Sequence, residues 1–277
     1  MGVFFRGVSG TLSNSRVHGV RHPGAAATCE SGAAVFVQGD GTHPIRVTVS
    51  GNDVYEYQRA GIAVNEAHAR ATIRDNSITG SGVTANLVQN GIQVAFGATA
   101  VIKGNVVRDN AGPSGSVCTF DGGNLSFMAD GGLIQGNTFR GNTAGVIVDG
   151  SKNRVLGNTV EGKSADVVMG LDGIMVAGDH NLVSTNVVRD MSEVGIRMEG
   201  SFNMAKRNVI SDTHEATLCA ASRALPGCDT VLGVCGVGLW IGGGSHNGNV
   251  RNTLSGNDVD VHSEGLRRLT VPRPVAP

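Results

Sequence analysis

The chain has few of the residues that usually mark a metal centre, a membrane span or a nucleic-acid surface. Aromatic residues make up 4% of its 277 residues, and its five cysteines form no Cys-x-x-Cys pair. Lysine and arginine (22) nearly balance aspartate and glutamate (23), so the formal net charge is -1. No apolar run approaches the roughly 18 residues that a membrane-spanning helix needs. These features exclude a zinc finger, a strongly basic domain and a spanning helix, and we expect neither nucleic-acid nor membrane partners.

The cysteines all lie outside the repeated segments of the chain. They are Cys29, Cys118, Cys219, Cys228 and Cys235. They are either free thiols or loop disulfides, and we favour one or two disulfides, with Cys219 and Cys228 paired because they bracket a single insertion. Disulfides form in oxidising compartments, so we expect an extracellular or periplasmic location, although the opening Met-Gly-Val-Phe-Phe-Arg is not a signal peptide.

Glycine is abundant, and much of it belongs to a short phrase that recurs between Gly145 and Ile210. The phrase places glycine, glycine, asparagine and asparagine at offsets 0, 5, 8 and 13, with copies beginning at Gly145, Gly173 and Gly195. The 42 glycines follow no three-residue period, which excludes collagen. A recurring unit of about 20 to 30 residues predicts a solenoid, in which each coil buries its apolar side by stacking on its neighbours.

The last asparagine of the phrase recurs along nearly the whole chain and marks the coils. The series is Asn14, Asn52, Asn76, Asn105, Asn137, Asn158, Asn186, Asn208 and Asn252. Apolar residues alternate around each asparagine, as Val155 and Val160 do around Asn158, and a period of two is typical of strands. Parallel stacking would align the asparagines in one column, where their amides bond to one another and to the turns. We therefore expect these asparagines to be structural.

Phrases of this kind also carry a resemblance to a known family. They include Gly61-Ile-Ala-Val, Asn90-Gly91-Ile-Gln-Val, Gly104-Asn105-Val106-Val107 and Gly157-Asn158-Thr159-Val160. From about Gly2 to Asp260 the chain resembles the right-handed parallel β-helix repeat superfamily, which includes pectate-lyase-like polysaccharide lyases, polygalacturonases, mannuronan epimerases and secreted repeat proteins. The resemblance implies an all-β, single-stranded right-handed parallel β-helix of about nine or ten coils of roughly 22 residues.

We expect this β-helix to span residues 1–262 and residues 263–277 to form a C-terminal cap and a disordered tail. Loop insertions are predicted at 23–31, 113–124 and 214–236, where glycine, alanine, serine and proline gather. The first unit, Gly2 to Val20, already resembles a coil with an open edge. We therefore expect that a capping segment or preceding coil is missing, or that a partner covers this end.

The outward positions of the Gly-Ile-x-Val strands predict two columns on the solenoid surface. One column reads Asn65, Ala95, Asp149, Ala177 and Glu199, and the other reads Ala63, Gln93, Ile147, Met175 and Arg197. Asp149 and Glu199 would stand two coils apart, ~9.6 Å between backbones, near the upper end of the ~6.5–9.5 Å spacing of an inverting glycosidase pair. Arg197 on the same face could bind a uronate carboxylate with two hydrogen bonds.

The remaining candidate residues surround this pair. In the predicted site, Asp149, Glu199 or His180 would transfer the proton, and Arg197 or Lys152 would neutralise the uronate. Asp172 would point inward if the alternation holds, either as a hydrogen-bonded loop anchor or as an acid with a perturbed pKa. The predicted substrate-binding residues are Lys152, Gln93, Asn65, Asp172 and Trp240. The alternative is that these polar residues are only solvated surface and turn positions.

The motifs of the named enzymes are mostly missing. Leu171-Asp172-Gly173 is the only similarity to the polygalacturonase pattern, and neither its Asp pair nor its Gly-His-Gly is present. The Asp-Pro-His-Asp signature of the epimerases is absent too. No cofactor is predicted, and a calcium site could draw only on Asp149, Glu199 and Asp172, without a motif to support it.

Three functional hypotheses remain. The first is a carbohydrate-active β-helix protein, a lyase, epimerase or hydrolase of an acidic polysaccharide, with a polysaccharide or oligosaccharide as its partner. The second is a non-catalytic binding or structural solenoid, such as a surface or spike module. The third is an enzyme acting on a small molecule held under the loop insertions. The sequence does not decide the oligomeric state.

Overall fold

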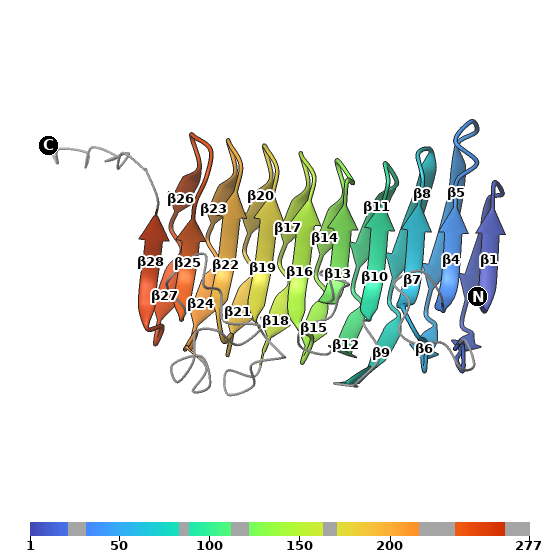
Figure 1. The fold of residues 1–277 in the computed structure, drawn as a ribbon, viewed down its shortest axis with the longest axis horizontal. Helices are drawn as coiled ribbons and strands as arrows, with labels where there is room; N and C mark the ends of the chain where they lie inside the picture. The colour runs from blue at the N-terminus through green and yellow to red at the C-terminus, as the bar shows by residue number, and fades with distance from the viewer. Residues whose placement is uncertain (22–31, 83–88, 112–121, 163–170, 216–235, 264–277) are drawn as a thin grey trace, which may run out of the picture.

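The computed structural model describes residues 1–21, 32–82, 89–111, 122–162, 171–215 and 236–263. All regular structure in these ranges is β-strand, and every strand pairs in parallel with its neighbours. The strands form three sheets of ten, nine and nine strands, called here sheets A, B and C. Each coil contributes one strand to each sheet in turn, and the coils stack along the long axis (Figure 1). The predicted single-stranded right-handed parallel β-helix is confirmed.

The strands of each sheet follow one another in chain order. Sheet A consists of β1 (Val3–Arg6), β4 (Ala33–Gln38), β7 (Ala60–Asn65), β10 (Asn90–Ala95), β13 (Gly122–Phe127), β16 (Ala144–Asp149), β19 (Asp172–Ala177), β22 (Val194–Glu199), β25 (Val237–Ile241) and β28 (Val259–Ser263). Sheet B consists of β2 (Gly10–Ser13), β5 (Ile45–Ser50), β8 (Ala69–Arg74), β11 (Thr99–Lys103), β14 (Leu133–Gln135), β17 (Arg154–Leu156), β20 (Leu182–Ser184), β23 (Met204–Lys206) and β26 (Gly248–Val250). Sheet C consists of β3 (Arg16–Val17), β6 (Asp53–Tyr55), β9 (Ser77–Gly82), β12 (Val106–Asn110), β15 (Thr138–Arg140), β18 (Thr159–Glu161), β21 (Val187–Arg189), β24 (Val209–Ser211) and β27 (Thr253–Ser255).

The core lies inside the coils, where inward rows of valine and isoleucine from the three sheets meet. Val146, Val155 and Val160, one from each sheet of the same coil, are all at most 1% exposed. The first glycine of each Gly-Ile-x-Val phrase lies where sheet C approaches sheet A. A Cβ on Gly145 would come within 2.3 Å of a Val160 methyl carbon, which is closer than any real contact. The repeated glycine is therefore required by packing.

The asparagine ladder between sheets B and C is also confirmed. Asn158 accepts hydrogen bonds from the backbone and side-chain nitrogens of Asn137 at 2.9 and 3.0 Å, and its own amide donates to Asn186 at 3.0 Å. The same pattern runs from Asn52 to Asn252, with these side chains buried or half-buried. The inclusion of Asn14 in the series was wrong. The register aligns Ser13 with Ser50 and Arg16 with Asp53, so Ser15 occupies the ladder position and its amide bonds to Asn52.

Two further predictions concern residues at the edges of the described ranges or outside them. The predicted insertion 113–124 ends too late, because strand β13 begins at Gly122 and pairs with β10 on one side and β16 on the other. All five cysteines, and with them the predicted disulfide, lie outside the described residues, as does segment 264–277. In the ranges described, there is no helix long and apolar enough to cross a membrane.

Candidate functional site

The outer face of sheet A carries the two predicted columns as rows of register partners. Ala177 pairs with Asp149 on one side and with Glu199 on the other, so the two carboxylates share one row with a single alanine between them. The neighbouring row runs through Ile147, Met175 and Arg197, and it continues to Trp240. The sequence prediction of these rows was correct but incomplete. Strand β13 adds Phe127 and Leu125, which lie next to Asp149 and Ile147.

Arg197 lies on this outer face but is not solvated. Its side chain is 10% exposed, and its Nη2 donates a hydrogen bond to Glu193 Oε1 at 3.0 Å. Its Nε lies 3.7 Å from Asp172 Oδ2, and its guanidinium carbon lies 5.6 Å from the centroid of the Trp240 ring. A buried cation needs such partners, because removing its charge from water without them costs on the order of several kcal/mol. Arg197 therefore ties three coils together, and the expected exposed position beside Glu199 is not observed.

Asp172 and Trp240 belong to the same cluster. The expectation that Asp172 points inward was wrong, because its carboxylate faces Arg197 on the outer side of the sheet. The cause is the glycine that follows Asp172: Gly173 packs against Val188 of sheet C, which shifts the alternation at the start of the strand. Trp240 is 3% exposed and packs with Val194 and Val237 in a small cluster apart from the main core.

Glu193 is the member of this cluster that the sequence prediction missed. It precedes strand β22, where the period-two pattern has not yet begun, so no repeat position marked it. Its side chain is 8% exposed and lies against Arg197, four residues later in the chain. The spacing alone could not reveal the pair, since residues four apart face each other regularly only on a helix.

Asp149 and Glu199 remain available to a ligand. Both are half-buried at the ends of β16 and β22, and neither forms an ion pair with another residue in the described part of the chain. Two strand spacings separate their backbones by ~9.6 Å. The residue between them in the row, Ala177, has only a methyl side chain. Of the predicted catalytic residues, Asp149 and Glu199 are the two that share one row of the sheet.

A row of one lysine and three ring-bearing side chains follows at the turn between sheets A and B. Lys152, His180, Phe202 and His246 occupy the same turn position, with φ of 60°, 59°, 58° and 58°. The rings of His180 and Phe202 stack with centroids 4.9 Å apart, and those of Phe202 and His246 stack at 4.8 Å. Left-handed backbone costs a non-glycine residue roughly 1–2 kcal/mol. Sequence reasoning assigned no role to His246, although Ser245-His246-Asn247 repeats the spacing of Ser201-Phe202-Asn203.

This turn row is held by a second asparagine ladder directly beneath it. Asn153 Oδ1 accepts a hydrogen bond from the backbone amide of Gly132 at 2.7 Å. Asn181 Oδ1 accepts one from the backbone amide of Asn153, and Asn203 Oδ1 accepts one from that of Asn181, both at 2.8 Å. All three are at most 2% exposed. The turn side chains therefore stand on a fixed backbone next to the carboxylate row.

Gln93 and Asn65 lie on the same sheet but in earlier coils. Gln93 Nε2 donates to Asn65 Oδ1 at 3.4 Å, and Asn90 Nδ2 donates to Gln93 Oε1 at the same distance. Gln93 belongs to β10 and Asp149 to β16, and β13 lies between these two strands, so Asp149 is two strand spacings from the amide cluster. The structure therefore does not bring Gln93 and Asn65 into contact with the carboxylate pair.

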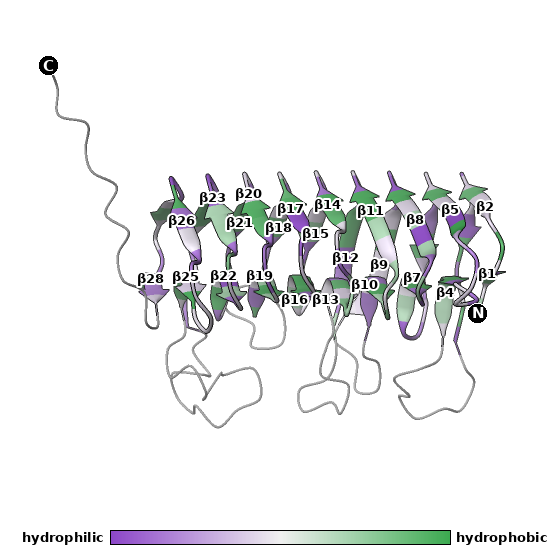
Figure 2. Cartoon of the chain, turned by 90° about the horizontal axis from the view of Figure 1, so that it is seen from above, coloured by the Kyte–Doolittle hydropathy of each residue, from purple (hydrophilic) through white to green (hydrophobic). Residues whose placement is uncertain are grey.

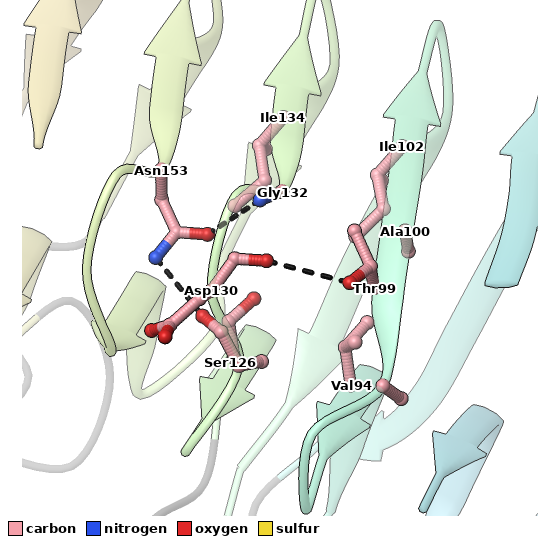
Figure 3. A pocket seen from close by; sticks show the side chains of 11 residues that line it. Val94, Thr99, Ala100, Ile102, Ser126, Asp130, Gly132, Ile134 and Asn153 are labelled. Atoms are coloured by element: carbon pink, nitrogen blue, oxygen red, sulfur yellow. Dashed lines mark hydrogen bonds between the residues drawn. The ribbon is translucent and has the colours of Figure 1, made fainter. Parts of the chain in front are cut away.

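A small gap inside the coils lies near strand β13. It is lined by Val94, Thr99, Ser126, Asp130 and Asn153 among others, and only about 10 Å³ is open to the centre of a water molecule (Figure 3). A single water needs about this much space, so the gap cannot hold a substrate. Within the described ranges, there is also no group of three or more His, Cys, Asp or Glu side chains that could hold a metal ion.

The fold defines the class of protein, and the family comparison agrees with it. Residues 1–166 match the family model described as right handed beta helix region, so the chain belongs to the right-handed β-helix family. Residues 114–271 match a second model, described as periplasmic copper-binding protein (NosD). Each match covers more than half of the chain. No curated protein matches the chain.

Proposed function

We propose that this β-helix protein is carbohydrate-active and cleaves an acidic polysaccharide on the outer face of sheet A. The observation that carries the proposal is the shared row of Asp149, Ala177 and Glu199. Two carboxylates flank a position occupied only by a methyl group, so a sugar ring and a water molecule can lie between them. The proposed site is on the surface of the solenoid, as a polymeric substrate requires.

Among lyase, epimerase and hydrolase reactions, this geometry supports inverting hydrolysis best. Backbones ~9.6 Å apart leave room for a water molecule beside the sugar, and inverting enzymes hold their carboxylates ~6.5–9.5 Å apart. One carboxylic acid protonates the leaving oxygen while the other carboxylate takes a proton from the attacking water. A lyase or epimerase instead needs a cation to neutralise the uronate carboxylate. Arg197 is already bound to Glu193 and Asp172, so of the predicted cations only Lys152 in the turn row could take that part.

The turn row next to the carboxylates supports a sugar-binding role. Phe202 is 49% exposed and follows Glu199 by three residues, and His180 stacks on it. Apolar ring surface beside carboxylates suits a sugar, which has apolar C–H faces and polar hydroxyl edges. Lys152 in the same row would attract a uronate carboxylate.

The copper-binding description of the second family model does not extend to these residues. Copper prefers imidazole and sulfur ligands. The ring of Phe202 stands between His180 and His246 and stacks with each of them, at 4.9 and 4.8 Å between centroids, so the two imidazoles do not face a common ion. We propose an extracellular or periplasmic location, in line with the word periplasmic in that description and with the substrate class.

A non-catalytic polysaccharide-binding solenoid is the second candidate. The observation in its favour is the sequestration of Arg197 by Glu193 and Asp172, which removes one of the predicted catalytic residues from the surface. The binding surface would be the same, but Asp149 and Glu199 would accept hydrogen bonds from sugar hydroxyls without moving a proton.

Turnover of uronate polymers by point variants tests the catalytic proposal. Asp149→Asn and Glu199→Gln should each lower kcat by roughly 100- to 10,000-fold, because each removes one proton-transfer step. New reducing ends report hydrolysis, and the ultraviolet absorbance of unsaturated products reports elimination.

The matched control is Asp53→Asn on sheet C, where the carboxylate lies 3.7 Å from Arg16 on the surface. This isosteric change should leave kcat unaltered. Wild-type protein that binds oligogalacturonate but yields no product in hydrolysis, elimination or epimerisation assays would support the non-catalytic candidate instead.

A further inference from the structure

The net charge of -1 conceals an uneven distribution of charge over the three sheets. The nine strands of sheet B contain no aspartate and no glutamate. They carry six cationic residues, namely Arg46, Arg70, Arg74, Lys103, Arg154 and Lys206. The strands of sheet C carry both signs, as in the contacts of Glu161 with Arg140 and Arg189. Sheet B is therefore a cationic face.

Four of the six cations gather on three adjacent coils. Arg46 of β5 pairs in register with Arg70 of β8, and Arg74 of β8 pairs in register with Lys103 of β11. Each pair spans one strand spacing of ~4.8 Å, and the two pairs lie ~13 Å apart along β8. All four residues are exposed. Figure 2 shows these strands side by side along one flank of the solenoid. We call this surface the β5–β8–β11 patch.

Most of the positive charges of the patch are not neutralised by ion pairs with described residues. Arg74 lies 2.9 Å from Asp75, but Arg46, Arg70 and Lys103 form no ion pair with any residue in the described part of the chain. Other acids near the patch lie in the turns before the strands. Asp40 accepts hydrogen bonds from the amides of Thr42 and His43, which hold its pKa well below the usual range and tie it to its own turn. The strand surface between the turns is left cationic.

We infer that the β5–β8–β11 patch is a second binding surface, which holds an acidic polysaccharide chain by its carboxylates. Arginine binds a carboxylate with two parallel hydrogen bonds, and rows of cations at the strand spacing suit a regularly charged linear polymer. The inference rests on the proposed acidic substrate and deepens it, because a long polymer could contact this face and the carboxylate row on sheet A at once.

A nucleic acid fits the same face less well. Proteins that bind single strands stack bases on aromatic side chains, and the described strands of sheet B contain none. Domains that bind duplexes are usually strongly basic, whereas this chain has a pI of about 6.7. The flat cationic surface without rings therefore favours a polymer of charged sugars.

The test measures binding of the full chain to immobilised polygalacturonate at two salt concentrations. The triple variant Arg46→Gln, Arg70→Gln and Lys103→Gln should weaken binding about tenfold, as three exposed charge contacts of modest strength would. Its binding should also depend less on salt, because fewer screened contacts remain. Far-ultraviolet circular dichroism checks that the coils are intact.

The matched control also removes three positive charges, but from sheet C. This triple variant, Arg108→Gln, Arg140→Gln and Arg189→Gln, should bind like wild type. Equal losses in both triple variants would mean that only net charge matters, and no loss in the sheet B variant would mean that the patch is not used. Either result overturns the inference. So would tighter binding of a short single-stranded DNA than of polygalacturonate, with the same sensitivity to the sheet B substitutions.

The result is independent of the catalytic test. If Asp149→Asn abolishes turnover while the sheet B triple variant binds normally, only the second surface is disproved. If the wild-type protein shows no turnover and the sheet B triple variant binds polygalacturonate more weakly than wild type, the catalytic proposal fails and the binding patch is supported.

Discussion

Arg197 shows at the scale of a residue how burial changes the meaning of a charge. Its position in the outward row suggested a ligand for a uronate, yet its guanidinium is held between two carboxylates and a tryptophan ring. A buried ion pair contributes little relative to apolar packing, but removing one partner leaves the others uncompensated. The role of Arg197 is to neutralise Glu193 and Asp172 within the outer face of sheet A.

Replacing this arginine should destabilise the protein. Arg197→Ala is expected to lower the free energy of unfolding by about 3–5 kcal/mol, because Glu193 and Asp172 would stay buried without a cation. Urea unfolding followed by circular dichroism measures the loss. The control Arg140→Ala removes an arginine that is 59% exposed and paired with Glu161. It should cost less than about 1 kcal/mol. Equal effects of the two substitutions would contradict the structural role of Arg197.

Asn124 and Ser126 are polar residues in rows that are otherwise apolar. Asn124 stands between Ile92 and Val146, and Ser126 stands between Val94 and Val148. Asn124 donates to Ser126 at 3.2 Å, but its buried Oδ1 accepts no hydrogen bond from the described residues. Ser126 also lines the small gap in the core. The pair is thus a weak point in this coil.

Substituting the residue types of the neighbouring coils should strengthen it. The double variant Asn124→Ile and Ser126→Val is expected to raise the free energy of unfolding by roughly 1 kcal/mol, since both hydrogen-bonding partners are replaced together by apolar groups. The midpoint of thermal unfolding reports the change, with Asn124→Ala alone as a destabilised comparison. A lower midpoint for the double variant would mean that the polar pair binds an internal water that the fold needs.

At the scale of elements, the asparagine ladder connects strands that are far apart in sequence. The side chain of Asn158 makes four hydrogen bonds: its Oδ1 accepts two from Asn137, and its Nδ2 donates to the Ile134 carbonyl and to Asn186 Oδ1, all at 2.9 or 3.0 Å. Each coil is therefore bonded to the coils on both sides at the turn between sheets B and C. At Asn158 these bonds hold the turn between two strands of only three residues each, β17 and β18.

Breaking the ladder in the middle should be costly. Asn158→Ala is expected to lower the free energy of unfolding by roughly 2–4 kcal/mol, because several buried backbone groups lose their partners. Asn14→Gly is the control, because Asn14 lies outside the ladder with a left-handed φ of 48° that glycine tolerates. Thermal unfolding compares the two variants. Similar shifts in both would indicate that the ladder is not what stabilises the turns.

For the whole molecule, the three sheets give three faces with different chemistry. Sheet A carries the carboxylate row and the buried arginine cluster, sheet B is cationic, and sheet C carries paired charges. The side chains that define these faces alternate with the core residues along each strand. A solenoid can therefore change one face without disturbing its core, since neighbouring coils require only the inward residues and turns.

The repeat within the chain is enough to predict the coils and the outward rows. Alternating apolar residues, a glycine demanded by packing and an asparagine at each turn are local requirements, and they recur at the same offsets in the three copies between Gly145 and Ile210. Asp149 and Glu199 could be aligned for that reason. The alignment of the coils predicted from the sequence differs from the observed register at Ser15 and at β13, because the number of residues between successive coils varies there.

Which outward residues are accessible, and which partners they contact, depends on how the coils pack together. Arg197 and Glu199 belong to the same strand and face the same side, but one is buried against Glu193 and the other is not. Neither the partnership of Arg197 with Trp240 nor the cationic patch on sheet B follows from spacing within one coil. Burial and charge clustering depend on residues of other coils, which come together only when the solenoid is assembled.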